Sequence, residues 1–378
     1  MKINTALLLK KELKKEYKVI VETLSGERVH ISCKGRNQHK GDHNRKAFIF
    51  PKQITIDEQF IEGIALYLGD GDFHRIEKNH TTFSSKDKDI VRHYLDFLRK
   101  YFLIKNEDVS FILRYKKENI FLKEEWGKVL DINPLKFLTY HAKRNKEETG
   151  NIQVNGLIFR KLFECIIQKI IFSGIFKKKS LRRAFLRGIF AAEGSVGIDR
   201  EEKSYIVQIA FSTGIHEKIL HKLIQTALEQ EEIRFRTDYG INDNSCDIII
   251  TNWKYYLKLW DIDLFSMCKR KKDGFEEIAK KLEIYLELEE KFRNSFFRSI
   301  ALKQKIIAKL IDSWQGNVSK AQAGIILLRV EQIKILIPYS SCSKERILSN
   351  TKNMRVGSLT KIKPNKTSIK FLKQFKSF

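Results

Sequence analysis

A nine-residue pattern occurs twice in this chain and constrains its fold more than any other feature. The first copy is Gly63–Gly71 (GIALYLGDG), the second is Leu186–Gly194 (LRGIFAAEG), and each ends in one acidic residue followed by glycine. The small and apolar residues recur at the spacing of three and four residues expected of one helix face. A carboxylate in the last turn of a helix lies beside unpaired carbonyl groups and the negative end of the helix dipole. Because this position is unfavourable for a carboxylate, two such acids indicate a role other than stabilising the helices.

The small residues predict that the two helices pack closely against each other. Helices with small side chains at their contact can approach to about 8 Å between axes. Such packing brings Asp70 and Glu193 to a common point. Adjacent carboxylates repel, so we expect either that one is protonated or that a divalent cation lies between them. We expect the helices to begin at Thr55, in a capping box, and at Ser180.

These two copies resemble the paired motifs of the LAGLIDADG homing endonucleases in their single-chain, two-motif form. The resemblance implies an α+β fold of two pseudo-symmetric αββαββα halves, whose antiparallel sheets form a DNA-binding saddle. It also implies that Asp70 and Glu193 bind divalent metal and cut DNA. The chain departs from the commonest motif at Ala65, where glycine is usual, in having Glu193 in place of Asp, and at Arg187, where an apolar residue is frequent. None of these changes removes an oxygen ligand.

The signals that follow each copy repeat in the same order, which predicts an internal duplication. In the first half we expect strands at 73–76, 80–85 and 109–116 around a helix at 87–101, and in the second half strands at 196–198, 205–212 and 233–239 around a helix at 216–229. The expected parts are an N-terminal β-hairpin with a basic loop (1–52), a first half with an insert at about 118–148 (53–176), a second half (177–273) and a helical C-terminal region with a basic tail (274–378).

The expected chemistry is hydrolysis of a phosphodiester bond. This reaction needs a nucleophilic water and neutralisation of charge at phosphorus, both of which Mg²⁺ held by carboxylates can provide. Oxygen ligands favour Mg²⁺, with Mn²⁺ as a substitute, over zinc. The main-chain carbonyls near Gly69 and Ala192 are candidate further ligands.

Basic and polar residues are candidates for assisting the acids. The family places a basic residue near each scissile phosphate, and the resemblance suggests Lys178 and Lys269. The alternative is that these lysines belong to the general basic surface, and Lys143 with Arg144 is a rival in the first half. His80 and Gln208 lie at matching places in the second strand of each half, either to orient water or as exposed strand residues.

Strand alternation assigns other residues to a DNA-binding face. One face of the strand at 109–116 is apolar and the other is polar, and the same holds at 233–239. Residues directly after each motif would also reach the DNA if the family geometry applies. The candidate DNA-binding residues are His74, Lys78, Arg114, Lys116, Ser195, Arg234 and Arg236.

Composition agrees with a nucleic-acid partner. The 378 residues include 72 lysines and arginines against 46 acids, a formal charge of +26 that favours a polyanion such as double-stranded DNA. No apolar run approaches the roughly 18 residues of a membrane span, so we expect no membrane association. With both motifs in one chain, we expect a monomer inside the cell, in the cytoplasm or at the nucleoid, with an organelle origin left open.

Three functions remain open from the sequence. The first is a site-specific double-strand DNA endonuclease which, by resemblance, leaves short 3′ overhangs. The second is an intron maturase that binds structured intron RNA, as some members of the family do. The third is a DNA-binding regulator. Helices expected at 275–296, 299–313, 319–328 and 331–337 form either a helix-turn-helix or a plain helical cap, and 361–376 is either a DNA-contacting arm or a solvated tail.

Overall fold

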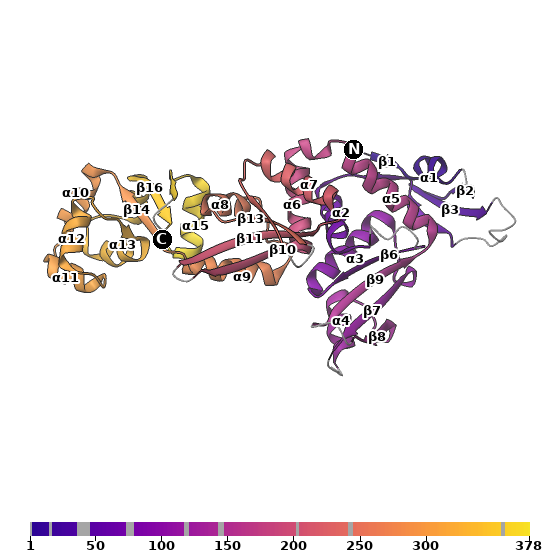
Figure 1. Cartoon of the computed structure of the whole chain (residues 1–378), viewed down its shortest axis with the longest axis horizontal. Coiled ribbons are helices and arrows are strands. Elements are labelled where there is room, and N and C mark those ends of the chain that lie inside the picture. The colour runs from indigo at the N-terminus through magenta and orange to yellow at the C-terminus, as the bar shows by residue number, and fades with distance from the viewer. Residues whose placement is uncertain are drawn as a thin grey trace. The chain divides into compact units, whose positions relative to one another are not determined.

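The computed structural model describes residues 2–14, 17–35, 46–72, 79–116, 121–142, 147–201, 204–240, 245–356 and 360–378. The chain forms two compact units (Figure 1). The first comprises Met1–Ser195, Ala210–Ile249 and Ile262–Lys272, and the second comprises Val196–Ile209, Ile250–Asp261 and Asp273–Phe378. No helix among the described residues is long and apolar enough to cross a membrane.

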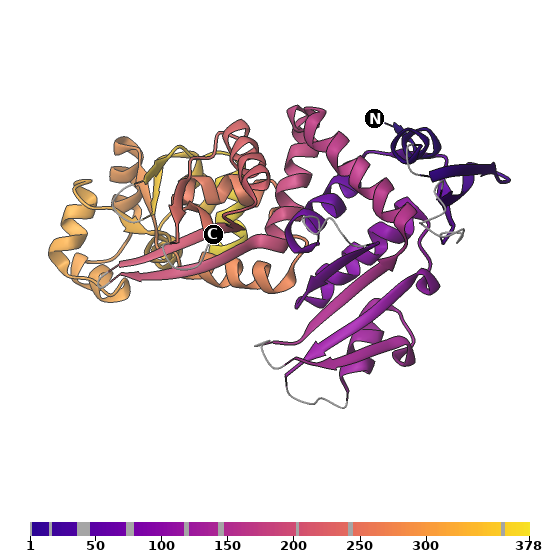
Figure 2. The same cartoon turned by 45° about the vertical axis from the view of Figure 1, so that its right-hand side comes forward.

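The first motif copy begins a mixed helix-and-sheet arrangement. The elements in chain order are α2 (Glu58–Asp70), β6 (His80–Ser85), α3 (Lys88–Phe102), β7 (Val109–Tyr115), β9 (Thr149–Asn155) and α5 (Leu157–Phe172). Strand β9 pairs antiparallel with both β6 and β7, as Figure 2 shows. The predicted strands at 80–85 and 109–116 and the helix at 87–101 are confirmed within one or two residues. The predicted strand at 73–76 lies outside the described residues.

The insert adds an edge to this sheet. It contains α4 (Leu122–Leu130), a short 3₁₀ helix η3 (Pro134–Lys136) and β8 (Phe137–His141), and the sheet order is β6-β9-β7-β8. Strand β8 pairs parallel to β7, so the expectation of a purely antiparallel sheet is wrong at this edge. A Cβ added at Gly150 would lie 2.2 Å from the Trp126 ring, so α4 packs directly on β9.

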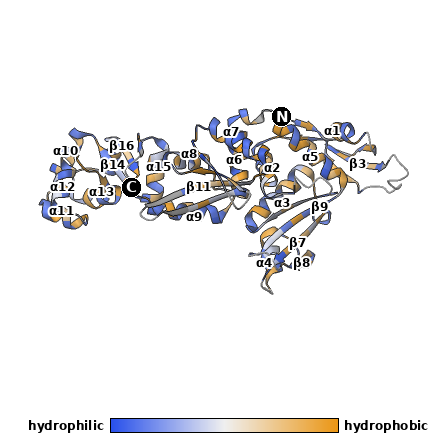
Figure 3. Ribbon diagram, in the orientation of Figure 1, coloured by the Kyte–Doolittle hydropathy of each residue, from blue (hydrophilic) through white to orange (hydrophobic). Residues whose placement is uncertain are grey.

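One face of this sheet is covered by helices and the other is polar. Along β6, Thr81, Phe83 and Ser85 are buried while the alternate residues are partly exposed. Helix α3 has a buried apolar side and a charged side, which Figure 3 shows as orange and blue. Phe97 of α3 makes edge-on contacts with Phe60 of α2 and Phe102, with ring centroids 5.5 Å apart in each pair. These rings form the core that supports α2.

The second motif copy begins the same order of elements. It contains α6 (Lys179–Glu193), β10 (Gly194–Glu201), β11 (Ser204–Gly214), α7 (Lys218–Gln230), β12 (Arg236–Tyr239), β13 (Ser245–Ile250) and α8 (Trp253–Asp261), with sheet order β10-β11-β13-β12. The order helix, two strands, helix, two strands, helix is therefore confirmed here. Strand β12 begins three residues later than expected.

Both motif helices begin at other residues than predicted. Thr55 ends strand β5 (Gln53–Thr55), which pairs with β1 (Lys2–Asn4). Because the sheet holds Thr55, α2 begins at Glu58, and the carboxylate of Asp57 accepts a 2.8 Å hydrogen bond from the Phe60 N–H. Helix α6 begins at Lys179, one residue before the predicted Ser180.

The N-terminal part forms a small sheet with one unexpected helix. Strands β2 (Tyr17–Thr23), β3 (Arg28–Gly35) and β4 (Phe48–Pro51) pair antiparallel, which confirms the predicted hairpin. Helix α1 (Thr5–Leu13), which the sequence did not indicate, precedes it. Phe48 stacks on Phe50 at 5.6 Å and contacts Phe159, so this sheet packs on α5.

The C-terminal region is a mixed fold, not a set of helices alone. It contains α9 (Lys269–Lys281), β14 (Ile284–Leu288), α10 (Glu290–Ser299), α11 (Gln304–Leu310), α12 (Gln315–Gln322), β15 (Leu328–Arg329), α13 (Val330–Leu336), a 3₁₀ turn η5 (Ile337–Tyr339), α14 (Lys344–Ser349), β16 (Thr351–Val356), β17 (Thr360–Ile362) and α15 (Lys366–Lys376). The predicted helix at 275–296 is wrong, because β14 interrupts it and pairs with β16. The predicted arm or tail at 361–376 is wrong too, because Phe371 and Phe375 of α15 pack on Trp260.

Candidate active site

The two motif helices approach each other so closely that glycine is required at their contact. A Cβ added at Gly69 would lie 2.6 Å from the Cβ of Ala192 and 2.9 Å from the Cγ of Glu193. Such distances are well inside the 3.5–4.0 Å of a carbon–carbon contact. The C-terminal ends of α2 and α6, with their two acids, therefore meet as the sequence predicted.

Nearer the middle of the helices, the residues that depart from the family motif make specific contacts. A Cβ added at Gly188 would lie 2.5 Å from the Glu62 carbonyl oxygen and 2.7 Å from the Cβ of Ala65. The guanidinium of Arg187 pairs with the carboxylates of Glu62, at 2.6 Å, and Glu58, at 3.2 Å. Arg187 thus joins α6 to α2 across the interface, which explains a charged residue at this position.

The two acids are partly buried, and both resist ionisation. Burial raises the pKa of Asp70 to about 6, although the charge of Lys271 and a hydrogen bond from Ser85 oppose the rise. Burial, and then the charges of Asp70 and Glu217, raise the pKa of Glu193 to about 8. Two carboxylates held together at this cost form a site that a divalent cation would stabilise, because the cation removes their repulsion.

A buried lysine lies beside this pair. The ammonium of Lys271 donates to the carbonyl oxygens of Phe190, Ala191 and Ala192 at 2.9, 2.5 and 3.0 Å. It thereby supplies a donor to the carbonyl groups at the end of α6, of which that of Phe190 also accepts from the Gly194 N–H. Burial lowers the pKa of Lys271. The Ala192 carbonyl, a predicted metal ligand, already accepts one hydrogen bond from Lys271.

The two predicted lysines lie elsewhere. Lys178 is exposed and precedes the first residue of α6, about 22 Å along the helix from Glu193. Lys269 has an exposed side chain, and its backbone N–H donates to the Asp89 carboxylate at 2.6 Å. Of the predicted basic segments, the member that reaches the acids is Lys271. The start of α9 decides which of the four adjacent basic residues at 269–272 points inward, and the sequence alone does not indicate where α9 starts.

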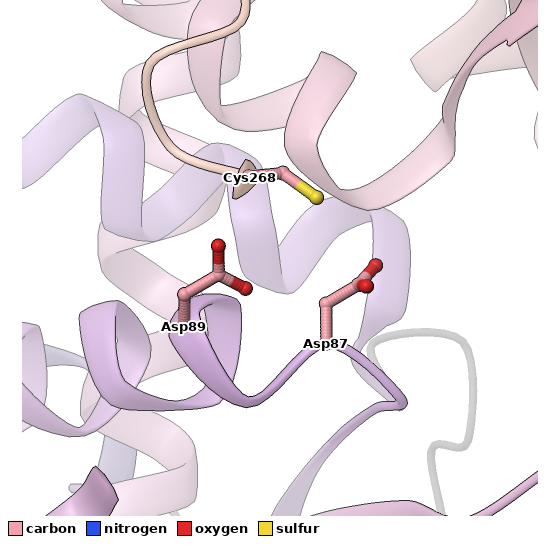
Figure 4. A group of neighbouring side chains, drawn as sticks. All are labelled: Asp87, Asp89 and Cys268. Atoms are coloured by element: carbon pink, nitrogen blue, oxygen red, sulfur yellow. The ribbon is translucent and has the colours of Figure 1, made fainter. Parts of the chain in front are cut away.

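Two acids and a cysteine also gather near the start of α3 (Figure 4). The ligand atoms of Asp87, Asp89 and Cys268 lie within 4.8 Å of one another. The guanidinium of Arg270 donates two hydrogen bonds to Asp87, at 2.8 and 2.9 Å. Burial tends to raise the pKa of Asp87, but this pairing outweighs burial and holds the pKa below its ordinary value. The Lys269 N–H donates to Asp89, and burial raises the pKa of the Cys268 thiol to about 11. These contacts thus attach the segment 268–270 to the start of α3.

An open polar groove extends from Asp70 over the uncovered face of the first sheet. Asp70 lines it together with Arg114, and the groove floor carries hydroxyl, amide and imidazole side chains from β6 and β9, which are His80, Thr82, Ser84, Asn151 and Gln153. The predicted alternation of β7 is confirmed: Val109, Phe111 and Leu113 are buried, whereas Arg114 is exposed. Asp70, Arg114 and His80 are therefore brought to one surface.

The remaining candidate residues that the structure describes are exposed or partly exposed. Ser195 is exposed two residues after Glu193, and Lys116 is exposed directly after β7. Arg234 and Arg236 are exposed at the start of β12, and Gln208 is a partly exposed residue of β11 in the second unit. His74 and Lys78 lie outside the described residues, as does the rival pair Lys143 and Arg144.

A buried network that the sequence did not reveal fixes the chain just after Asp70. Arg160, only 1% exposed, donates to the Asp72 carboxylate at 3.1 Å, to the Tyr67 hydroxyl at 3.3 Å and to the His80 carbonyl at 3.1 Å. The Tyr67 hydroxyl donates to the same Asp72 oxygen at 2.8 Å. The network joins α5 to the end of α2 and to β6, so it fixes the backbone on both sides of Asp70.

Comparison with known proteins gives matches to solved structures alone. No protein-family model matches the sequence, and no curated protein matches it. I-DmoI in complex with DNA and Mn is 13% identical, with 55% of this chain and 98% of that chain covered and a TM-score of 0.32. The homing endonuclease I-WcaI bound to its DNA recognition sequence is 14% identical, with 57% and 83% covered and a TM-score of 0.33. The LAGLIDADG homing endonuclease I-LtrWI bound to target DNA is 14% identical, with 58% and 89% covered and a TM-score of 0.32.

TM-scores of this size do not establish a shared fold. Function is therefore inferred from the residues around Asp70 and Glu193.

Proposed function

We propose that this protein is a divalent-metal-dependent DNA endonuclease whose active site is formed by Asp70 and Glu193. The observation that carries the proposal is the meeting of these acids at the ends of two helices that glycine allows to touch. The groove beside them and the charge of +26 supply a surface for a polyanionic substrate. The resemblance of both motif copies to the LAGLIDADG pattern points to the same chemistry.

The chain's own groups would act as follows. Asp70 and Glu193 would hold the ion, and Mg²⁺, with Mn²⁺ as a substitute, supplies activation of water and neutralisation of the phosphate when bound. Lys271 fixes the end of α6 and adds positive charge beside the acids. Arg114, exposed in the groove that Asp70 lines, would bind a backbone phosphate.

The finer features are also part of the proposal. The halves at 53–176 and 177–273 would each contribute one acid and contact one half of a long, asymmetric duplex, so a monomer would make both cuts. Short 3′ overhangs and a role in intron homing follow from the resemblance. The residues for which we propose DNA contacts are Arg114, Lys116, Ser195, Arg234 and Arg236, together with His74 and Lys78.

Cleavage of a randomised duplex library tests the proposal. Purified protein is incubated with the library and Mg²⁺, and the new ends are sequenced, beside an EDTA control and the Glu193→Gln variant. We expect cuts at one long motif that require both the metal and Glu193. Cuts that persist in Glu193→Gln, or a library left intact under every metal condition, would contradict it.

A further inference from the structure

Helices α11 and α12 of the second unit form a compact helix-turn-helix. Four residues separate them, and Asp312 in this turn has a left-handed φ of 46°. Small Ala308 lies buried in α11, and Val318 in α12 is fully buried. A pair of helices joined by a turn of three or four residues is the arrangement of the DNA-binding helix-turn-helix. The structure therefore favours this alternative over a plain helical cap.

Neighbouring helices hold the pair rigidly. Gln332 of α13 donates to the Ile311 carbonyl at 3.1 Å, which satisfies the end of α11. Arg293 of α10 donates to the Gln322 carbonyl at 3.0 Å, which satisfies the end of α12. Two supporting helices thus fix the side of the motif that faces the core and leave the opposite face of α12 exposed.

The exposed face of α12 carries polar and small residues, and the Ser319 hydroxyl of this face donates to Gln304 of α11 at 3.3 Å. Its members are Gln315, Gly316, Ser319 and Lys320, all exposed. A Cβ added at Gly316 would meet no atom within 4 Å. Glycine weakens a helix compared with alanine, and at Gly316 no neighbouring protein atom requires the side chain to be absent. Close approach of the helix backbone to a ligand would explain it.

Charge and polarity identify the ligand. Between Ala301 and Val330 the chain has five basic residues, Lys303, Lys305, Lys309, Lys320 and Arg329, against the single acid Asp312. Exposed lysines at both ends of α11 suit the phosphate backbone. The glutamine that begins α12 suits a base edge, since its amide can pair with adenine. The deep, narrow major groove of an RNA helix does not admit an α-helix, whereas that of DNA does.

We infer that α12 is a recognition helix that enters the major groove of double-stranded DNA, so the second unit is a sequence-specific binding module. This inference does not depend on cleavage by the first unit.

The test uses the full chain in EDTA, so that binding is measured without cutting. A binding selection on randomised duplexes gives the preferred motif and its affinity for the wild type and for Gly316→Glu. We expect Gly316→Glu to bind DNA at least tenfold more weakly, because the new side chain obstructs entry of α12 into the major groove. The melting temperature should be unchanged, because the new side chain meets no protein atom. Ser295→Glu, an equal charge change at an exposed residue of α10, is the matched control and should stay within about threefold.

Two further variants distinguish base reading from phosphate attraction. Gln315→Ala should relax the preference at one or two base pairs, and Lys309→Ala should weaken all sequences alike and reduce the salt dependence by about one phosphate contact. The inference is overturned if Gly316→Glu and Gln315→Ala bind the wild-type motif as tightly as Ser295→Glu does. It is equally overturned if a structured RNA displaces the duplex at lower concentration than unlabelled duplex does.

Discussion

Replacing Gly188 with alanine tests whether the motif helices are packed as closely as the structure indicates. In an exposed helix this change stabilises a protein by about 0.5–1 kcal/mol, because alanine is the better helix former. At Gly188 the new methyl carbon would lie 2.5 Å from the Glu62 carbonyl oxygen and 2.7 Å from the Cβ of Ala65. Neither atom is the end of a flexible side chain, so the two helices must separate.

The size of the effect follows from these distances. Restoring an ordinary carbon–carbon contact requires a separation of about 1 Å. Overpacking of this kind costs about 1–3 kcal/mol. The same shift moves Asp70 relative to Glu193, and a 1 Å displacement of reacting groups can reduce a rate by about 100-fold. Cleavage should therefore fall much further than folding stability alone explains.

The assay is urea unfolding followed by circular dichroism, paired with cleavage of a selected duplex. Gly274→Ala is the matched control, because a Cβ at Gly274 meets no atom within 4 Å and the residue lies within helix α9. We expect the control to be as stable as the wild type or more stable, and equally active. A Gly188→Ala protein that is as stable as its control would refute the close packing, and with it the explanation of the motif's small residues.

Three other predictions concern the acids and their lysine. Asp70→Asn and Glu193→Gln should keep DNA affinity within about tenfold, or about 1.4 kcal/mol, and abolish cleavage, as measured by gel shift and product analysis; full cutting by either would exclude that acid from the mechanism. Because the pKa values of Asp70 and Glu193 are raised in the folded protein, the stability that these two protonated acids contribute to metal-free protein should be lost as the pH rises from about 4 to about 8. Thermal melts of Glu193→Gln should lose less stability than the wild type over that range. Lys271→Met should destabilise the fold by about 1–3 kcal/mol, since the Ala191 and Ala192 carbonyl groups lose the Lys271 donor while that of Phe190 keeps the Gly194 N–H. Lys269→Met should leave unfolding unchanged, and equal effects of the two variants would contradict the assignment.

Local patterns in the sequence predict much of the first unit. Both motif helices, the alternation of β7 and the hairpin of β2 and β3 follow from periodicity over a few residues. Asp70 and Glu193 were identifiable because each ends such a helix. The interruption by β14 was not, because 275–296 mixes charged and apolar residues at a spacing that also suits one long helix.

Interactions between distant residues account for the rest. Arg160 and Asp72 are 88 positions apart, and nothing local marks either as the other's partner. The choice of Lys271 over Lys269 depends on where α9 begins and on the pairing of Arg270 with Asp87, 183 positions away. Both cases involve buried polar groups, whose partners depend on the complete fold.

Titration of Mn²⁺ into the protein, with a selected duplex bound, tests most directly whether Asp70 and Glu193 form one shared metal site. Calorimetry should show metal binding to the wild type that either Asp70→Asn or Glu193→Gln removes, because each acid supplies part of the same site. Wild-type affinity for Mn²⁺ in either single variant would contradict the shared site and the mechanism built on it.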